Sequence, residues 1–343
     1  MTKKIKVVFF DTDDMTTDYI QEHIPEEVDV FFERKTLNDV TEKDLARYGD
    51  AEIVSVFTHA KRLLANKLDL FPNLKMISTR CTGFDHIDLD YTRKRGIVVT
   101  NVPNYGAITV AEYTMGLMMA TARKIRLANS DLKTNKVQMD KYMGMDLYGK
   151  TLGVIGTGAI GRHVVQLATA FGMKVLVYDP YPSEAVKKMG AQYVSLPHIY
   201  TQSDIITLHC PATPENYHLL NKPTFQLMKQ GVLIINTARG TLIDTKALYN
   251  AMKSGKVGGV GLDVLESEDV LTLREISTEE KQEGDSFLNS VINYKILQSE
   301  KAIITPHVAF NSLDAMYRIL GMTLESITTF LQGKPAYVVT PRK

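Results

Sequence analysis

The sequence has few of the residues that mark a secreted, metal-binding or membrane-spanning protein. Its 343 residues include no tryptophan and only two cysteines, Cys81 and Cys210, whose spacing matches no metal-binding pattern. Two isolated cysteines also provide no disulfide framework. The longest apolar runs have strand length or belong to amphipathic helices, which excludes a transmembrane helix of about 20 residues. We therefore expect a cytoplasmic protein without a metal site.

Neither sign of charge is in excess. Forty lysines and arginines stand against 39 aspartates and glutamates, so the formal net charge is +1. This balance gives no support for binding to nucleic acid or to an anionic membrane through bulk charge. The N-terminal segment MTKKIKVVFFD passes from two lysines directly into a strand-like run and lacks the pattern of a signal peptide. We expect a small molecule, rather than nucleic acid or a membrane, as the partner.

One stretch, residues 151–180, carries the functional prediction. A short apolar run is followed by the glycine-rich turn GTGAIG at 156–161, and apolar residues then recur at helical spacing up to Phe171. A second strand-like run at 174–178 leads directly to Asp179. Strand, glycine turn, helix, strand and acid, in this order, form the dinucleotide-binding fingerprint in the context that it requires.

Each part of this fingerprint has a physical task. Gly156 makes the tight turn, Gly158 lets the backbone approach a pyrophosphate, and Gly161 lets the helix and the strand pack closely. Ala159 and Ile160 begin the helix, whose free N–H groups and partial positive charge favour a phosphate. The turn is therefore predicted to bind the pyrophosphate of a dinucleotide.

Asp179 predicts which nicotinamide cofactor binds. Its carboxylate stands where it can accept hydrogen bonds from both ribose hydroxyls, and it would repel a 2′-phosphate. We therefore expect NAD rather than NADP.

The residues before position 105 predict a second α/β domain. Strand-like and helical signals alternate there, which is typical of a parallel sheet with flanking helices. The strand-like runs are Ile5–Phe10, Val28–Phe32, Ile53–Phe57, Leu74–Thr79 and Ile97–Thr100. The first of them ends in the sequence DTDD at 11–14, whose carboxylates would repel a phosphate. We therefore do not expect this domain to hold the nucleotide.

Further strand-like runs complete the nucleotide-binding sheet. They are Thr151–Ile155, Lys174–Tyr178, a short run near Tyr193, Ile205–His209, Val232–Ile235, Gly259–Asp263 and Ile303–Thr305. The final segment predicts a helix at Ser312–Leu331 and a possible strand at Tyr337–Val339, which would pack back on the first domain. The prediction is thus an α/β protein with two doubly wound parallel sheets. A flavodoxin-like substrate domain spans 1–104 and is completed by 309–343, and a Rossmann NAD domain spans 105–308.

Two segments have open interpretations. A helix at about Thr109–Arg126 carries apolar residues on more than one stripe, so it is either an internal core helix or a helix partly buried against a second subunit of a homodimer. The segment between Asp263 and Ala302 starts acidic and irregular. We interpret most of it as a solvent-exposed segment. One helix in it could pack against the domain through the apolar residues Phe287, Leu288, Val291, Ile292 and Ile296.

Ligands on doubly wound sheets bind outside the C-terminal ends of the strands, so the residues that follow each strand are the candidates for chemistry. They are Asp179, Cys210, Pro211, Thr237, Ala238, Arg239, Asp263 and His307. A histidine titrates near neutral pH, and an arginine presents a planar fork to a carboxylate. From spacing alone, however, His307 and Arg239 could equally be a capped loop histidine and a surface arginine. Glu268 could hold the imidazole, but spacing alone favours a solvated acid.

Four motifs in order, GTGAIGR, NTARGTLID, GLDVLESE and TPHVAF, resemble those of the D-isomer-specific 2-hydroxyacid dehydrogenase family. The segments NVPNYGAITVAEYTMGLM and STRCTGFDHIDLD extend the resemblance over nearly the whole chain. The overall length and the long segment before TPH are most similar to the D-lactate dehydrogenase branch.

The resemblance implies a role for each matched residue. Arg239 matches the substrate-binding arginine, Glu268 its paired acid, and His307 the catalytic acid/base. Asp263 matches the acid that holds the nicotinamide carboxamide. Apart from the resemblance, Cys210 is expected to line the adenine side of the cofactor cleft.

The first domain would contribute to substrate binding. Thr82 and Gly83 match the loop whose backbone amides receive the substrate carboxylate, and Tyr105 matches a tyrosine that lines the substrate pocket. Phe57 and Phe310 are weaker candidates for the pocket, because ordinary core packing is the expected role of each.

The function implied is the NAD-dependent reduction of a small 2-oxo acid to the D-2-hydroxy acid, and its reverse, with pyruvate and D-lactate as the first expectation. Phenyllactate, hydroxyisocaproate and glyoxylate types of dehydrogenase are alternatives within the family. An NAD-sensing binding protein similar to the transcriptional corepressors on this fold is an alternative of a different class.

Overall fold

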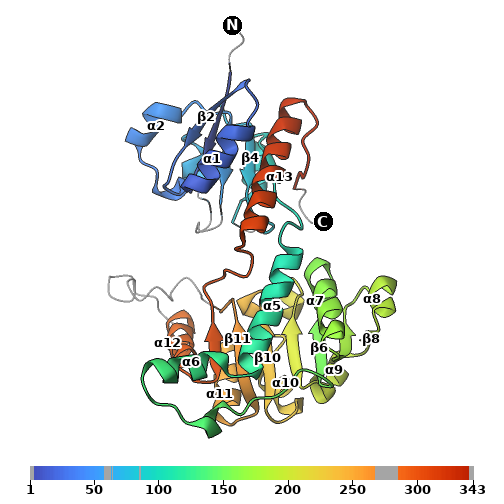
Figure 1. Ribbon diagram of the computed structural model, residues 1–343. Helices are drawn as coiled ribbons and strands as arrows, with labels where there is room; N and C mark the ends of the chain where they lie inside the picture. Colours follow the sequence, from blue (N-terminus) through green and yellow to red (C-terminus); the bar gives the residue numbers. More distant parts are fainter. Residues whose placement is uncertain (1–3, 58–62, 64, 85, 267–284, 340–343) are drawn as a thin grey trace. The chain divides into compact units, whose positions relative to one another are not determined.

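The computed structural model describes residues 4–57, 63, 65–84, 86–266 and 285–339. The chain forms two compact units, which we call unit 1 (Met1–Tyr105 with Ser312–Lys343) and unit 2 (Gly106–Asn311). The domains expected from the sequence, 1–104 with 309–343 and 105–308, have boundaries close to these. Both units are α/β, with a parallel sheet in each (Figure 1). This confirms the predicted fold class.

Unit 1 contains a five-stranded parallel sheet in the order β2-β1-β3-β4-β5, the flavodoxin-like order. Its strands are β1 (Ile5–Phe9), β2 (Val28–Phe32), β3 (Ile53–Val56), β4 (Met76–Thr79) and β5 (Val98–Thr100). Its helices are α1 (Asp14–His23), α2 (Glu42–Tyr48), α3 (Ala65–Leu68), α4 (Leu89–Lys94), α13 (Leu313–Leu331) and the 3-10 turn Leu37–Asp39.

The apolar residues of β1 explain why both faces of this sheet are covered. Successive side chains of a strand point to opposite faces. Val7 and Phe9 enter a core with Leu320 of α13, whereas Val8 and Phe10, the residue after β1, enter a separate core with Tyr48 of α2. On the first of these faces α1 and α13 lie side by side (Figure 1).

The C-terminal residues return to the sheet of unit 1 without forming the expected strand. Only an isolated antiparallel bridge joins Val338 to Thr100 among the described residues. The backbone of Val339 donates to the carbonyl of Val99 at 2.8 Å, and Asn101 donates to the carbonyl of Tyr337 at 3.1 Å. The segment therefore pairs with β5 over too short a length to count as a strand.

Unit 2 contains a seven-stranded parallel sheet in the order β12-β11-β10-β9-β6-β7-β8, which is the Rossmann order with one added strand. Its strands are β6 (Thr151–Ile155), β7 (Lys174–Tyr178), β8 (Gln192–Tyr193), β9 (Ile205–Leu208), β10 (Val232–Asn236), β11 (Val257–Leu262) and β12 (Ala302–Ile304). Its α-helices are α5 (Ala107–Ala122), α6 (Ile125–Lys133), α7 (Ala159–Ala170), α8 (Glu184–Lys188), α9 (Leu196–Gln202), α10 (Lys222–Leu227), α11 (Thr245–Lys253) and α12 (Asp285–Leu297). The short 3-10 helices are Met139–Tyr142, Pro214–Asn216 and Gly240–Leu242.

The helix expected at Thr109–Arg126 is two helices. The chain leaves α5 at Ala122, and Lys124 adopts a left-handed conformation with φ +52° before α6 begins. Within α5, Met115 and Met118 are buried in the core that covers the sheet of unit 2. This burial favours the interpretation of α5 as an internal core helix.

Helix α12 corresponds to the helix that the sequence allows between Asp263 and Ala302. Ile292 and Ile296 are buried in the core of unit 2, whereas Leu288 and Val291 are exposed. The side chain of Phe287 and the whole of 267–284 lie outside the described residues. Across the described parts of the chain, a helix suited to spanning a membrane is not found.

Candidate active site

The predicted cofactor residues gather at one edge of the sheet of unit 2. All seven strands are parallel, so their C-terminal ends lie at the same edge. The candidates that follow these ends are Gly156 after β6, Asp179 after β7, Cys210 and Pro211 after β9, Thr237 to Arg239 after β10, Asp263 after β11 and His307 after β12. The sheet therefore brings together residues that the sequence separates by up to about half the chain.

The glycine turn has the geometry that its sequence predicts. Gly156 adopts φ +95°, which favours glycine, and a Cβ there would lie 2.6 Å from the backbone nitrogen of Cys210. A Cβ at Gly161 would overlap the carbonyl oxygen of Gly156. At Gly158, by contrast, a Cβ would have no described atom within 4 Å. The protein thus packs tightly around Gly156 and Gly161 and leaves space beside Gly158.

The N-terminus of α7 faces this space. Gly158 is the N-cap residue of α7, and within the described structure no side chain caps the helix through it. Free N–H groups and the positive end of the helix dipole therefore remain available to an anion, as a dinucleotide pyrophosphate requires. Ala159 and Ile160 form the first turn of the helix. The residues present fit the predicted dinucleotide.

Asp179 is tied to the same turn. Its Oδ2 accepts hydrogen bonds from the backbone N–H of Thr157 at 2.7 Å and from the Thr157 hydroxyl at 3.0 Å. Its Oδ1 accepts from the backbone N–H of Tyr181 at 2.9 Å. The carboxylate that was predicted to bind ribose is therefore held beside the glycine turn.

Cys210 and Pro211 form the wall behind the turn. Burial raises the pKa of the Cys210 thiol to about 11, so it stays protonated and acts as a packing group. The side-chain amide of Asn216 donates to the carbonyl of Pro211 at 2.6 Å. The neighbouring His209 is half-buried, and burial lowers its pKa to about 3, so it is neutral.

A buried asparagine shapes the turn that carries Arg239. The side chain of Asn236 donates to the carbonyl of Arg239 at 2.9 Å and accepts from the backbone N–H of Ala238 at 3.0 Å. The hydroxyl of Thr237 lies 2.9 Å from that of Thr114 on α5. The guanidinium of Arg239 is exposed at the sheet edge and donates through Nη1 to the carbonyl of Ala238 at 2.7 Å. Sequence reasoning did not single out Asn236, although it stands in the NTARG motif.

Asp263 holds the turn that carries His307. This carboxylate is 1% exposed; Oδ1 accepts from the Thr305 hydroxyl at 2.5 Å and from the Val308 N–H at 3.0 Å. Oδ2 accepts from the Ala309 N–H at 2.8 Å. Burial raises the pKa of Asp263, although these hydrogen bonds act in the opposite direction. The sequence did not predict these partners, because they depend on the pairing of β11 with β12.

His307 is exposed and adopts a left-handed conformation with φ +53°. Its backbone N–H donates to the carbonyl of Asp263 at 2.9 Å, and such a conformation persists in a non-glycine residue only where its surroundings hold it. Strands β10 and β12 flank β11, so the strand ends before Arg239 and His307 lie about 10 Å apart. Both exposed side chains therefore stand at the edge that contains the glycine turn.

Glu268 lies outside the described residues. Its neighbour Glu266 is 8% exposed and accepts hydrogen bonds from Tyr217 at 3.0 Å and from His218 Nε2 at 2.8 Å. The side chain of Asn293 donates to its carbonyl at 2.7 Å. Sequence reasoning missed this cluster, although Glu266 lies in the same GLDVLESE motif.

The substrate candidates of unit 1 lie on hydrogen-bonded turns. The Thr82 hydroxyl donates to the carbonyl of Val102 at 2.9 Å, and the Asn101 side chain donates to the carbonyl of Thr82 at 2.8 Å. Gly83 follows in the same turn. The carbonyl of Tyr105 accepts from Arg318 Nε at 2.7 Å. These bonds define the backbone of the predicted carboxylate loop.

The two weaker pocket candidates contact charged or titratable groups. Phe310, in unit 2, meets the His307 ring edge-on at 6.5 Å between ring centres. The ring centre of Phe57, in unit 1, lies 5.3 Å from the guanidinium carbon of Arg80. Neither aromatic ring therefore serves core packing alone.

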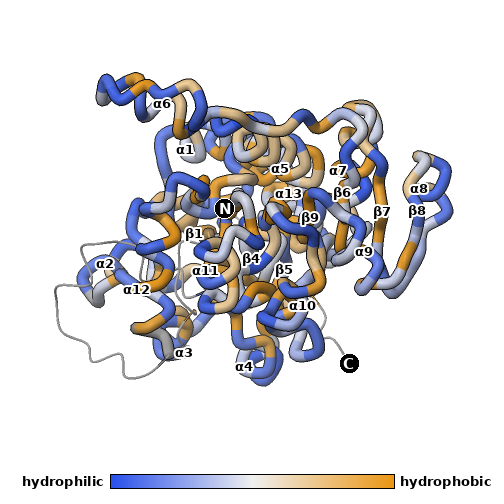
Figure 2. Tube along the Cα trace, turned by 90° about the horizontal axis from the view of Figure 1, so that it is seen from below, coloured by the Kyte–Doolittle hydropathy of each residue, from blue (hydrophilic) through white to orange (hydrophobic). Residues whose placement is uncertain are grey.

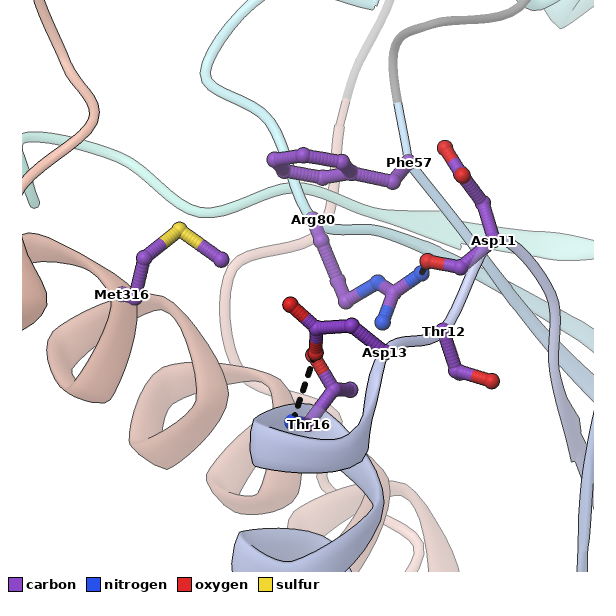
Figure 3. A pocket seen from close by; sticks show the side chains of 7 residues that line it. All are labelled: Asp11, Thr12, Asp13, Thr16, Phe57, Arg80 and Met316. Atoms are coloured by element: carbon purple, nitrogen blue, oxygen red, sulfur yellow. Dashed lines mark hydrogen bonds between the residues drawn. The ribbon is translucent and has the colours of Figure 1, made fainter. Parts of the chain in front are cut away.

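Unit 1 has a cavity of about 250 Å³ at the C-terminal ends of β1, β3 and β4. Figure 3 shows its lining, which is formed by Asp11, Thr12, Asp13, Thr16, Phe57, Arg80 and Met316. Arg80 is 2% exposed and donates through Nη2 to the carbonyls of Phe10 and Asp11. Burial lowers the pKa of Arg80 to about 10, so it remains a cation near neutral pH.

Comparisons with known proteins agree with the sequence and the geometry. Residues 115–309 match the family model for the D-isomer specific 2-hydroxyacid dehydrogenase NAD binding domain. The chain is 37% identical over 297 residues to D-lactate dehydrogenase of Escherichia coli K12, covering 86% of this chain and 88% of that protein. It is 39% identical over 298 residues to a 2-hydroxyacid dehydrogenase homolog of Haemophilus influenzae, covering 87% of each.

A solved structure extends the similarity to the whole fold. D-lactate dehydrogenase of Aquifex aeolicus, complexed with NAD and lactic acid, superposes with a TM-score of 0.83 at 36% identity, covering 98% of this chain and 100% of that one. The predicted family, fold class and cofactor are thereby confirmed. The chain belongs to the D-isomer-specific 2-hydroxyacid dehydrogenase family, and NAD is its cofactor.

Proposed function

We propose that the protein catalyses the NAD-dependent interconversion of pyruvate and D-lactate. The observation that carries this proposal is the placement of Arg239 and His307 at the strand edge that also presents the glycine turn and Asp179. The similarity to the D-lactate dehydrogenase of Escherichia coli supports pyruvate as the first substrate to test.

The proposed chemistry needs a proton donor and a positive charge close to the C2 oxygen of a 2-oxo acid. When bound, NADH supplies the hydride. The protonated imidazole of His307 gives its proton to that oxygen, and in the reverse direction the neutral ring takes it back. The guanidinium of Arg239 stabilises the negative charge that develops there, an effect of about 3 kcal/mol by analogy with a single oxyanion donor.

Two acidic residues support His307 in this proposal. Asp263 orients the histidine through hydrogen bonds to the Thr305–Ala309 turn, which hold the backbone in a conformation that it would not otherwise keep. Glu268, matched through its motif to the family's paired acid, would hold the imidazole of His307.

Unit 1 is assigned to substrate binding. The backbone amides of Thr82 and Gly83 would receive the carboxylate, and Tyr105 would line the pocket. The hydrogen bonds from Thr82 to Val102 and from Asn101 to Thr82 support this role, because they order the loop before a substrate arrives.

A panel of 2-oxo acids tests the proposal. NADH oxidation is measured with pyruvate, phenylpyruvate, 2-oxoisocaproate and glyoxylate, and the chirality of the product is determined. The highest kcat/KM with pyruvate, and formation of the D-isomer, would support the proposal. A higher value for another acid would assign that substrate instead, whereas tight NADH binding without turnover of any acid would favour the NAD-sensing alternative.

We also propose that the protein is a homodimer. The support comes from exposed apolar side chains on α6 and the segment before β6: Leu132 (69% exposed), Met139 (77%), Met143 (77%) and Tyr148 (80%). Figure 2 shows that hydrophobic and hydrophilic residues alternate along α6. Light scattering at micromolar concentration tests this proposal, since a monomer would contradict it. The cytoplasmic location stays a prediction from the sequence.

A further inference from the structure

The carboxylate of Asp179 is the end of a chain of hydrogen bonds that starts outside the glycine fingerprint. The backbone N–H of Ser183 donates to the hydroxyl of Tyr193 at 2.9 Å. That hydroxyl lies 2.9 Å from the hydroxyl of Thr157, which in turn donates to Asp179 Oδ2 at 3.0 Å. Tyr193 belongs to β8, the edge strand beside β7, so residues from three segments converge on one carboxylate.

The hydroxyl protons in this series of hydrogen bonds have only one possible arrangement. Each hydroxyl has a single proton to donate. The proton of Thr157 is used on Asp179, so the bond between the two hydroxyls requires Tyr193 to donate to Thr157. Tyr193 itself accepts from Ser183, so all the donors point towards the carboxylate. Hydrogen bonds aligned in this way polarise one another, and the last one, to a charged acceptor, is the strongest.

These contacts leave Asp179 little freedom. An ionised carboxylate has about four acceptor positions, and the two donors of Thr157 and the N–H of Tyr181 occupy three of them. The position that is left, on Oδ1, can accept a hydrogen bond from one ribose hydroxyl, whereas the sequence predicted bonds from both. A 2′-phosphate has only acceptors and negative charge to offer. It could enter only if Asp179 turned away, and that movement would break the bonds to Thr157.

We infer that Thr157 and Tyr193 are positioning residues that set the preference for NAD over NADP by holding Asp179 in place. The carboxylate of Asp179 is only partly buried at the end of β7. Without the two hydroxyls only the backbone N–H groups of Thr157 and Tyr181 would hold it, so it could rotate more easily towards solvent, where water would screen its repulsion of a phosphate. The family membership establishes NAD as the cofactor, whereas this inference concerns how the chain rejects the phosphorylated form.

The ratio of two dissociation constants tests this inference. Binding of NADH and of NADPH is measured by fluorescence titration at one ionic strength, for the wild type and for Thr157→Val, Thr157→Ser and Tyr193→Phe. We expect the preference for NADH to fall about tenfold in Thr157→Val and about fivefold in Tyr193→Phe, and to change less than about twofold in Thr157→Ser, which keeps the hydroxyl. Since NADH and NADPH differ only in the 2′-phosphate, general damage to the fold would weaken both and leave the ratio unchanged.

Tyr178→Phe is the matched control. Tyr178 directly precedes Asp179 in the sequence, but its hydroxyl makes no hydrogen bond within the described parts of the chain, so its removal should leave the ratio unchanged. An unchanged ratio in Thr157→Val and Tyr193→Phe would overturn the inference. An equal loss in Thr157→Ser and Thr157→Val would also overturn it, because the hydroxyl would then have no role. If Thr157→Val does not fold, Tyr193→Phe alone decides the matter. The titrations use no 2-oxo acid, so their outcome is independent of the proposed substrate.

Discussion

The β1–α1 connection of unit 1 and the β6–α7 connection of unit 2 share the order strand, turn, helix, but they present opposite chemistry at the helix N-terminus. In unit 1 the side chain of Asp13 accepts from the backbone N–H of Thr16 at 2.8 Å and so caps α1. In unit 2 the cap position of α7 is Gly158, beside which a Cβ would meet no described atom within 4 Å. A capped helix has used part of its affinity for anions, whereas an uncapped one keeps it.

The two units also differ in whether the arginine at the C-terminal strand edge is buried or exposed. In unit 1 a buried arginine, Arg80, donates to the backbone after β1, with Asp11 and Asp13 raising its pKa against the effect of burial. In unit 2 the arginine of the strand edge, Arg239, is exposed. The same strand–turn–helix connection can thus serve structure in one α/β unit and ligand binding in the other.

The two arginines provide the largest expected contrast. Arg239→Gln should lower kcat/KM about 10²- to 10³-fold, because the charge that stabilises the developing alkoxide is lost. Its thermal stability should stay close to that of the wild type, since the side chain is exposed. Arg80→Gln should instead destabilise the fold by about 3 kcal/mol, because removal of the buried cation leaves the neighbouring carboxylates without a compensating charge.

Steady-state kinetics and urea denaturation of both variants test this contrast. Arg93→Gln, an exposed arginine on α4, is the control and should change neither quantity. A loss of activity without a loss of stability in Arg80→Gln would break the comparison, because Arg80 would then belong to the functional site.

A second contrast, within the glycine turn, compares Gly161, where the protein packs closely, with Gly158, where space is left for the cofactor. Gly161→Ala should destabilise unit 2 by about 2–3 kcal/mol, because its Cβ would overlap the carbonyl of Gly156. Gly158→Ala should keep the wild-type melting temperature but bind NADH more weakly, since the added methyl group enters the space left for the pyrophosphate. Thermal melts with and without NADH measure both effects. Equal melting temperatures for the two variants without NADH would contradict this account of the turn.

The smallest expected effect is on the pH dependence of stability, through the two carboxylates that hold turns, Asp13 and Asp263. Burial alone would raise the pKa of Asp13, but hydrogen bonds from Thr16 outweigh it and lower the pKa. Its contribution to stability is therefore present above the unfolded pKa of about 3.9 and is lost as pH falls through the lower folded value. Burial raises the pKa of Asp263, so its contribution has the opposite sign: it is present below about pH 3.9 and is lost as pH rises through the higher folded value.

Asparagine at position 13 isolates this effect, because it also caps helices but does not titrate. Asp13→Asn should match the wild type at neutral pH and lose less stability than the wild type at acid pH. Asp13→Ala should cost about 1 kcal/mol at neutral pH through loss of the cap. Urea denaturation between neutral and acid pH measures both variants, and an Asp13→Asn protein that follows the wild-type pH profile would argue against the assigned role.

Much of the fold could be predicted from the sequence, because the strands of a parallel sheet are continuous apolar runs between turn signals. Val28–Phe32, Thr151–Ile155 and Lys174–Tyr178 have the predicted bounds, and the other strands differ by one or two residues at their ends. The break between α5 and α6 was missed, because it depends on the left-handed conformation of Lys124, for which the residue type gives no signal.

The candidate site was predicted as a set of residues but not as a network. The fingerprint and the motifs identify residues one at a time, and their order along the sheet follows from the topology. The contact of Asp263 with the His307 turn joins residues 42 to 46 positions apart, and that of Glu266 with His218 spans 48. Such pairs have no local pattern, because they exist only after the strands have paired.

The central claim, that His307 moves the proton at the cofactor edge of unit 2, is tested most directly by His307→Gln. The measurement combines kcat for pyruvate reduction at saturating NADH with the dissociation constant of NADH. The account predicts a fall in kcat of about 10²- to 10⁴-fold with NADH binding changed less than about twofold. Near-normal turnover in this variant would contradict it.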